Sequence, residues 1–164
     1  MNHTLESLLR FVNLTTSGLL AGSLGFGEQA LVPGWQRELP QHEDRRARAI
    51  AALTNATGYF NAIGPVALGT AVTIAVGSRG AKPIKRALDA VAAISLAGVL
   101  AATILVTVPI NRELDEQAPT DYPSDRSQSL AKNWSRAHAV RTTLGVGAFL
   151  CAVASNLARP CHAK

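Results

Sequence analysis

Four long stretches without a charged residue constrain this chain more than any other feature of its sequence. They cover residues 11–27, 56–77, 90–110 and 142–158, and they are 17, 22, 21 and 17 residues long. A helix needs about 20 apolar residues to cross the hydrocarbon core of a bilayer, within a range of about 17–25. Helices this apolar on every side would leave a soluble bundle without a polar surface to expose to water. The stretches therefore predict four transmembrane helices.

The composition fits this interpretation because most charges lie between the apolar stretches. Only 16% of the residues are charged, against roughly 25% in an ordinary soluble domain. We expect one all-α integral membrane domain over residues 1–164, an up-down-up-down four-helix bundle. Its helices are expected at about 8–33, 54–77, 88–110 and 136–158. The loop between helices one and two and the loop between helices three and four are expected to form a polar cap outside the membrane.

The orientation in the membrane follows from where the cations are dense. With the N-terminus inside, seven cations face the cytoplasm and nine face the other side, so the count alone does not decide. Residues 78–87 carry four cations beside two predicted helix ends, where the positive-inside bias is strongest. We therefore expect both termini in the cytoplasm, with the protein in the cell (inner) membrane and with Arg10 and Lys85 among the cations at the lipid headgroups. No basic surface massed on one water-facing element is evident, so no nucleic-acid partner is expected.

Small residues recur inside the predicted helices at spacings typical of close helix packing. Membrane helices lack a hydrophobic driving force between them, so small residues let their backbones approach. The same small-residue faces could pack between two copies of the chain, so a homo-oligomer is an open alternative. Two prolines are expected to kink or end helices: Pro65 lies inside the second stretch and Pro109 closes the third. The small residues are Gly18, Gly22, Ala93, Ala97, Ala101, Gly145, Ala148 and Ala152.

Most polar side chains near the apolar stretches are predicted at one mouth of the bundle. They stand near the end of helix one, the start of helix two, the end of helix three and the start of helix four, which an up-down bundle brings to the same side. Polar groups at membrane depth are costly and tend to face the interior or a cavity. A polar pocket at this mouth is the default site hypothesis. Its expected members are Glu28, Asn55, Tyr59, Asn61, Asn111, Trp134, His138 and Arg141.

The fourth helix carries the sharpest pattern. Trp134, His138, Arg141 and Gly145 are spaced at i, i+4, i+7 and i+11, which places them on one helical face. A histidine can act as a base or an acid near neutral pH. An arginine can stabilise an oxyanion through a forked pair of hydrogen bonds. This face therefore indicates a site for proton transfer beside an aromatic wall.

Structural roles compete with each of these assignments. Trp134 could belong to an interfacial aromatic belt, and Arg141 could extend to the membrane surface as a topology charge. His138 could make a hydrogen bond between a loop and its helix, and Asn111 could cap the third helix. Glu28 could form an internal salt bridge to Arg141 or Arg48. The residue types alone do not separate these alternatives from a functional site.

No cofactor or metal is predicted. The histidines His3, His42, His138 and His162 are scattered along the chain, and neither an HExxH nor a CxxC motif occurs. No glycine-rich phosphate loop follows a strand, so a nucleotide-binding fold is not expected. A haem or a copper ion whose ligands come together from distant loops stays open as the alternative.

Three segments of the sequence resemble the anthrone oxygenase family of small four-helix membrane proteins. They are residues 17–22 (SGLLAG) with Pro33 after them, residues 108–111 (VPIN) and residues 133–142 (NWSRAHAVRT). The resemblance implies an oxidoreductase of polyketide metabolism that converts an anthrone to an anthraquinone with molecular oxygen. For that chemistry we expect His138 as the base, Arg141 and Asn111 as partners of the enolate oxygen, and Trp134 as a stacking wall.

Two classes of function therefore stand at this point. The first is a membrane-embedded, oxygen-dependent oxidase or monooxygenase of a lipophilic polycyclic aromatic, with Trp134, Glu28, Tyr59 and Asn55 binding the substrate. The second is a small membrane module without enzymatic activity, such as a carrier, a channel subunit or a scaffold. The partners expected of the first class are a lipophilic aromatic molecule, oxygen and the lipid bilayer. The identity of the substrate is left open.

Overall fold

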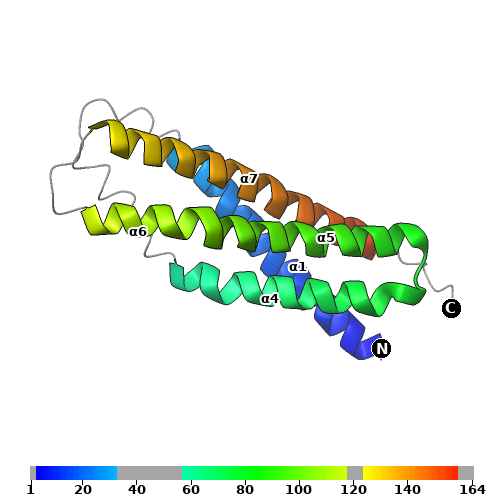
Figure 1. The fold of residues 1–164 in the computed structure, drawn as a ribbon. Coiled ribbons are helices and arrows are strands. Elements are labelled where there is room, and N and C mark those ends of the chain that lie inside the picture. The colour runs from blue at the N-terminus through cyan, green and yellow to red at the C-terminus, as the bar shows by residue number, and fades with distance from the viewer. Residues whose placement is uncertain (1–2, 33–56, 118–123, 159–164) are drawn as a thin grey trace.

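The computed structural model describes residues 3–32, 57–117 and 124–158, and in these ranges the chain is helical with no strand (Figure 1). The first helix, α1 (His3–Phe26), continues into a π-helical segment, η1 (Gly27–Leu31). The second, α4 (Thr57–Gly77), ends in a short 3-10 turn, η2 (Ser78–Gly80). The third runs without a break through α5 (Pro83–Ala102), the π-helical η3 (Thr103–Thr107) and α6 (Val108–Gln117). The fourth is α7 (Ser124–Leu157).

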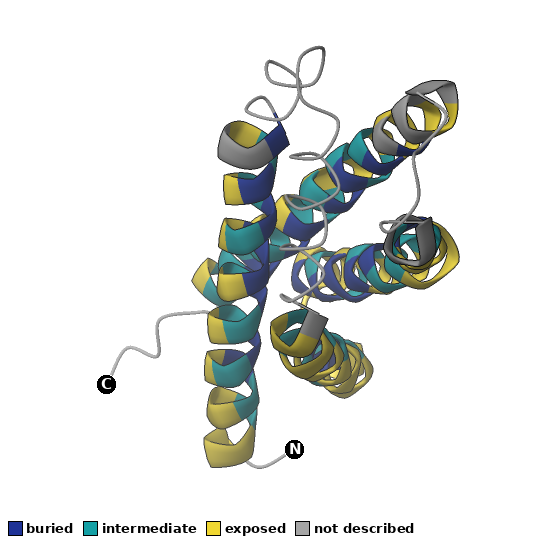
Figure 2. Cartoon of the chain, turned by 90° about the vertical axis from the view of Figure 1, so that its left-hand side faces the viewer, coloured by how far each residue is buried: buried dark blue, intermediate teal, exposed yellow. Residues whose placement is uncertain are grey.

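The four helices pack in a ring in the order α1, α4, α5 and α7, so that each one contacts two neighbours. In Figure 1 the start of α1 and the end of α7 lie toward the end of the molecule where α4 turns into α5. Buried residues line the inward faces of the helices and exposed residues cover the outward faces (Figure 2). The centre is built of small and medium apolar side chains, including Leu24, Ala67, Leu96 and Ala148. The ring therefore has a tightly packed centre, as expected when small residues bring helices together.

Three helices are long and apolar enough to cross a membrane: Gly58–Gly80, Pro83–Glu113 and Lys132–Leu157. Their outward surface is apolar, with exposed Ile94, Leu105 and Leu150 as examples. A surface of this kind suits lipid and not water, as in a membrane protein. The first helix, α1, does not meet the same criterion, so the fourth predicted crossing is not shown.

The predicted small-residue contacts are only partly present. A Cβ atom on Gly18 would lie 3.1 Å from Phe149 and one on Gly145 would lie 3.0 Å from Leu24, so both glycines allow close helix packing. Ala97 and Ala101 are instead exposed. An interval of four residues exceeds the 3.6-residue helical repeat, so such a series turns about 40° further round the helix at each step. That drift carries the last two alanines out of the interface.

Pro109 does not end the third helix, contrary to the sequence expectation. The helix continues to Gln117 because a π-helical turn precedes the proline, with the Val108 amide bonded to the Thr103 carbonyl five residues earlier. Proline cannot donate a hydrogen bond and its ring crowds the carbonyl four residues earlier. The wider π turn accommodates both effects.

Arg10 and Lys85 do not face the lipid headgroups, contrary to the sequence expectation, because both are buried. Arg10 is only 3% exposed and makes two hydrogen bonds of 3.1 Å to the carboxylate of Asp89. Its Nε atom bonds to Glu6 at 2.9 Å, and the buried Lys85 lies 3.5 Å from Asp89. Ser155 of α7 donates a further hydrogen bond to Asp89. These five residues, here called the distal cluster, join α1, α5 and α7 because opposite charges face one another across the helices.

Candidate functional site

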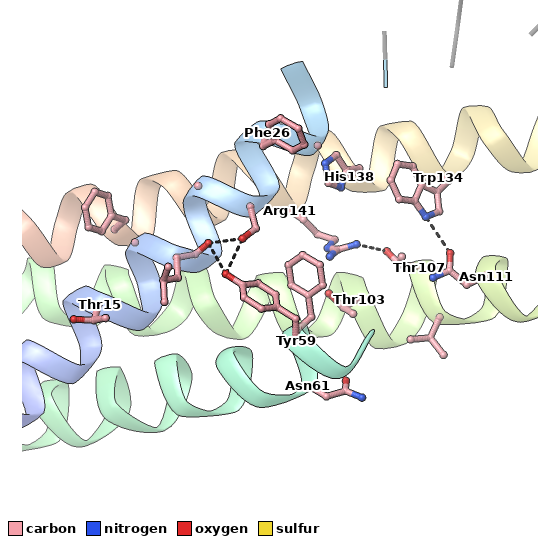
Figure 3. A pocket seen from close by; sticks show the side chains of 18 of the residues that line it. Thr15, Phe26, Tyr59, Asn61, Thr103, Thr107, Asn111, Trp134, His138 and Arg141 are labelled. Carbon is pink, nitrogen blue, oxygen red and sulfur yellow. Dashed lines mark hydrogen bonds between the residues drawn. The ribbon is translucent and has the colours of Figure 1, made fainter. Parts of the chain in front are cut away.

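A cavity of about 890 Å³ lies between the helices in the part of the molecule away from the distal cluster (Figure 3). All four helices contribute to its walls, which include Tyr59, Asn111, Trp134, His138 and Arg141 from the predicted site. Asn61, also predicted there, is among the lining residues. The remaining lining side chains are mostly apolar and come largely from α1. The volume is in the range of ordinary ligand pockets, roughly 300–1,000 Å³.

The face of α7 that carries Trp134, His138 and Arg141 is turned into this cavity. All three residues are buried, with exposed fractions of 5–7%. The rings of Trp134 and His138 are stacked, with centroids 4.8 Å apart and planes 9° from parallel. Trp134 is therefore not a residue of an outer aromatic belt, and Arg141 does not extend to the membrane surface. The helical spacing predicted this shared face because it is a local property of one helix.

A hydrogen bond to α1 orients His138 and assigns its proton. The Nε2 atom lies 3.1 Å from the carbonyl oxygen of Leu24. Because a carbonyl oxygen only accepts, Nε2 donates, and the neutral ring then holds its lone pair on Nδ1. Nδ1 is buried and has no hydrogen-bond partner among the described residues. Nδ1 of His138 is therefore a basic nitrogen to which no residue of the described chain donates a hydrogen bond.

Gly27 makes the contact between His138 and α1 possible. A Cβ atom at this position would lie 2.7 Å from Nε2 of His138 and 3.0 Å from Cε1. Real Cβ atoms do not approach other atoms so closely, so any side chain would push the imidazole away from Leu24. Nothing in the amino-acid pattern singled out Gly27 among the chain's many glycines.

Arg141 is held by an uncharged oxygen and an aromatic ring. Its Nη1 atom donates to the hydroxyl of Thr107 over 3.1 Å, and its guanidinium lies 5.9 Å from the centroid of the Phe60 ring. Its Nε atom is buried without a hydrogen-bond partner. Within the described chain, no Asp or Glu lies within ion-pair distance of it. Thr107 was not predicted, although its spacing of four residues before Asn111 was a usable signal.

Asn111 connects the third helix to the fourth. Its side-chain oxygen accepts a hydrogen bond of 3.0 Å from Nε1 of Trp134. This bond fixes the tryptophan ring over His138 and leaves the amide nitrogen of Asn111 as the group that can donate to a ligand. Asn111 lies inside α6, which runs on to Gln117, so the alternative that it caps a helix end is wrong.

Both π-helical segments border the cavity. Gly27 is the first residue of η1, and Thr103 and Thr107 are the first and last residues of η3; all three line the walls. A π turn inserts an extra residue into the helical repeat and changes the direction of the side chains around it. Such turns are frequent at functional sites. Here they contain Gly27, which leaves room for the His138 ring, and Thr107, which accepts a hydrogen bond from Arg141.

The other predicted site residues have different surroundings. The Tyr59 hydroxyl lies 2.8 Å from the Ser23 hydroxyl and donates to the Leu19 carbonyl over 3.3 Å, so it links α4 to α1 at the edge of the cavity. Glu28 is half-buried, does not line the cavity and forms no ion pair with Arg141. Asn55 and Arg48 lie outside the described residues.

In residues 3–32, 57–117 and 124–158, no three His, Cys, Asp or Glu side chains come together as metal ligands would. His42, His162 and Cys161 lie outside these ranges. The expectation of no cofactor therefore stays a prediction.

Comparison with known proteins identifies the family. The anthrone oxygenase family model matches residues 52–151, which is more than half of the chain. The matched region contains Asn111, Trp134, His138 and Arg141, whereas α1 lies before it. Neither the curated proteins nor the solved structures contain a match. The chain belongs to the anthrone oxygenase family.

Proposed function

We propose that the protein is a membrane-embedded, oxygen-dependent oxidase of a lipophilic polycyclic aromatic ketone, of the anthrone-to-anthraquinone type. One observation carries the proposal. His138, whose Nδ1 has no hydrogen-bond partner among the described residues, and Arg141, which has no carboxylate partner among them, line the same largely apolar cavity. Family membership supports an oxidoreductase of this kind.

The chemistry requires few groups from the protein. An anthrone carries a CH₂ group between two aromatic rings, opposite its ketone. Loss of one proton from this carbon gives an anion whose charge lies largely on the ketone oxygen. The anion reduces O₂ and forms a C–O bond at the same carbon, and loss of water leaves a second carbonyl. Anthrone and one O₂ thus give anthraquinone and one water, so no external reductant is needed.

Each step can be assigned to a residue of the cavity. His138 accepts the proton on Nδ1, because Nε2 already donates to Leu24. Arg141 and the amide nitrogen of Asn111 donate hydrogen bonds to the developing oxyanion. Trp134 forms a flat wall against which a planar ring system stacks. Removal of a base or an oxyanion donor typically lowers a rate on the order of 10²–10³-fold.

A lipophilic substrate gives a reason for the location in a membrane, because a polycyclic aromatic partitions into the bilayer. We place the protein in the cell membrane, with cytoplasmic termini and with α1 as the fourth crossing of an up-down-up-down bundle. The loops between helices one and two and between helices three and four would form the polar cap. A role in polyketide metabolism follows from the family alone.

The test uses purified protein in detergent with an anthrone under oxygen. We expect quinone formation above the spontaneous rate, and a loss of on the order of 10²-fold in the enzymatic part of that rate in His138→Ala and Arg141→Ala. Arg136→Ala is the matched control, because Arg136 is an exposed cation on the same helix. Wild-type rates in both cavity variants would refute the assignment. Ligand binding without any turnover would favour the carrier or scaffold alternative.

Metal analysis and a visible spectrum of the same sample test the cofactor prediction. We expect no stoichiometric copper and no haem absorbance. Stoichiometric copper or a haem spectrum would replace the proposed cofactor-free reaction with one that depends on the bound group.

A further inference from the structure

The surroundings of Arg141 differ from those of every other buried cation in the described chain. These cations are Arg10, Lys85 and Arg141. Arg10 and Lys85 each lie within ion-pair distance of both Glu6 and Asp89. Arg141 is as buried as they are, yet it faces only the hydroxyl of Thr107 and the ring of Phe60. Within the described residues, the buried cations at one end of the bundle are therefore neutralised, whereas the one at the other end has no counter-ion.

An unpaired buried charge is expensive, because it has left water and gained no partner. Its Nε–H is one donor for which the described chain provides no acceptor. The amide nitrogen of Asn111 borders the same cavity. Arg141 and Asn111 thus bring hydrogen-bond donors and a positive charge to one cavity, and an anionic oxygen group complements both.

The remainder of the cavity specifies the rest of such a ligand. Leu14, Leu19, Phe26 and Phe149 line it together with Gly18 and other small residues of α1. Among the described residues that line the cavity, none other than Arg141 carries a permanent charge. The cavity therefore suits a molecule with an extended apolar body and a single negative end.

We propose that the cavity is a binding site for lipophilic organic anions, namely planar aromatic carboxylates and phenolates, with Arg141 as the charge partner. This inference rests on the proposed function for the identity of the site and deepens it by naming the class of ligand. It requires binding only, so it extends to compounds that oxygen cannot oxidise at this site.

The experiment compares two ligands with the same three-ring body. Anthracene-2-carboxylate is ionised at pH 8, whereas anthracene-2-carboxamide is neutral. The full chain carrying Trp35→Phe keeps Trp134 as its one tryptophan, because the sequence contains two. Energy transfer from Trp134 to the bound anthracene reports occupancy of the cavity. Each ligand is titrated against every variant in the same micelles, so that partition into detergent cancels between variants.

We expect the carboxylate to bind about tenfold or more tightly than the carboxamide. Arg141→Gln should abolish this preference, and Arg141→Lys should retain part of it because the charge is kept. Arg136→Gln removes a charge from the exposed side of the same helix and should leave the preference unchanged. Equal affinities for the two ligands in the unsubstituted cavity would overturn the proposal, as would an undiminished preference in Arg141→Gln.

Gel filtration establishes whether Arg141→Gln is folded. If it is not, the comparison of the two ligands with intact Arg141 and with Arg141→Lys decides the matter. Quinone formation without a carboxylate preference would overturn this inference alone. A carboxylate preference without quinone formation would overturn the proposed oxidase activity alone.

Discussion

Replacement of Asp89 by asparagine should lower the free energy of unfolding by about 3 kcal/mol. The distal cluster contains two cations, Arg10 and Lys85, and two carboxylates, Glu6 and Asp89. Asparagine has the size of aspartate and opens no cavity, so the substitution changes the charge of the cluster and little else. Breaking a buried ion pair by removing one partner typically costs about 3–5 kcal/mol, because the other charge stays buried. The lower end applies because Glu6 still lies 2.9 Å from Nε of Arg10.

The double variant Arg10→Met, Asp89→Leu removes the whole ion pair, whereas Asp89→Asn leaves one buried charge without its partner. Replacing a buried ion pair by apolar residues of similar volume is often neutral or stabilising. The double variant should therefore be more stable than Asp89→Asn, even though it changes more atoms. The matched control is the ion pair between Glu113 and Arg126, whose side chains are 30% and 56% exposed. Its removal by Glu113→Gln should cost about 0–1 kcal/mol.

Reversible unfolding in mixed micelles, followed by circular dichroism, measures all three variants. The reasoning fails if Asp89→Asn costs no more than Glu113→Gln. It also fails if the double variant loses more stability than Asp89→Asn, since the pair would then stabilise the fold by its own attraction.

Two further predictions concern the cavity. Gly27→Ala should displace His138, because the added Cβ would lie 2.7 Å from its Nε2 atom; the catalysed rate should fall on the order of tenfold or more while the micelle-bound protein keeps its helical circular dichroism. Thr107→Val removes the hydrogen-bond acceptor of Arg141 at nearly constant volume. Quinone formation should then slow by roughly tenfold, a loss of about 1.4 kcal/mol, and an unchanged rate would show that Thr107 does not position the guanidinium.

Properties of a single helix were predictable from this sequence. The apolar stretches indicate where helices occur, and the i, i+4, i+7 spacing placed Trp134, His138 and Arg141 on one face. Both depend only on local periodicity. The ends of the helices were less accessible, because an apolar stretch measures the hydrocarbon thickness while the helix continues into polar sequence. The fourth helix was expected to begin at about residue 136, whereas α7 begins at Ser124.

Contacts between helices were not predictable in the same way. The partner of Arg10 is Asp89, 79 residues away, and nothing in either sequence neighbourhood indicates the pairing. Glu28 was assigned by its depth in the first helix without regard to its face. The cavity-lining residues Gly18, Gly22 and Phe26 recur every four positions on α1. Glu28 belongs instead to the π-helical η1, where the α-helical repeat does not hold, and it does not line the cavity.

The contrast between Arg141 and the paired cations of the distal cluster leads to a last prediction about stability and ligand binding. If the charge of Arg141 is compensated only when a ligand binds, replacing Arg141 should not destabilise the protein without ligand. Arg141→Met keeps an unbranched side chain and should leave the free energy of unfolding unchanged or raise it, by up to about 1–4 kcal/mol. Anthracene-2-carboxylate should stabilise the wild-type protein in the same unfolding assay and have no effect on Arg141→Met. A loss of stability like that of Asp89→Asn would contradict this reasoning. Arg141, which is 5% exposed, would then be a structural residue stabilised by more than its contacts to Thr107 and Phe60.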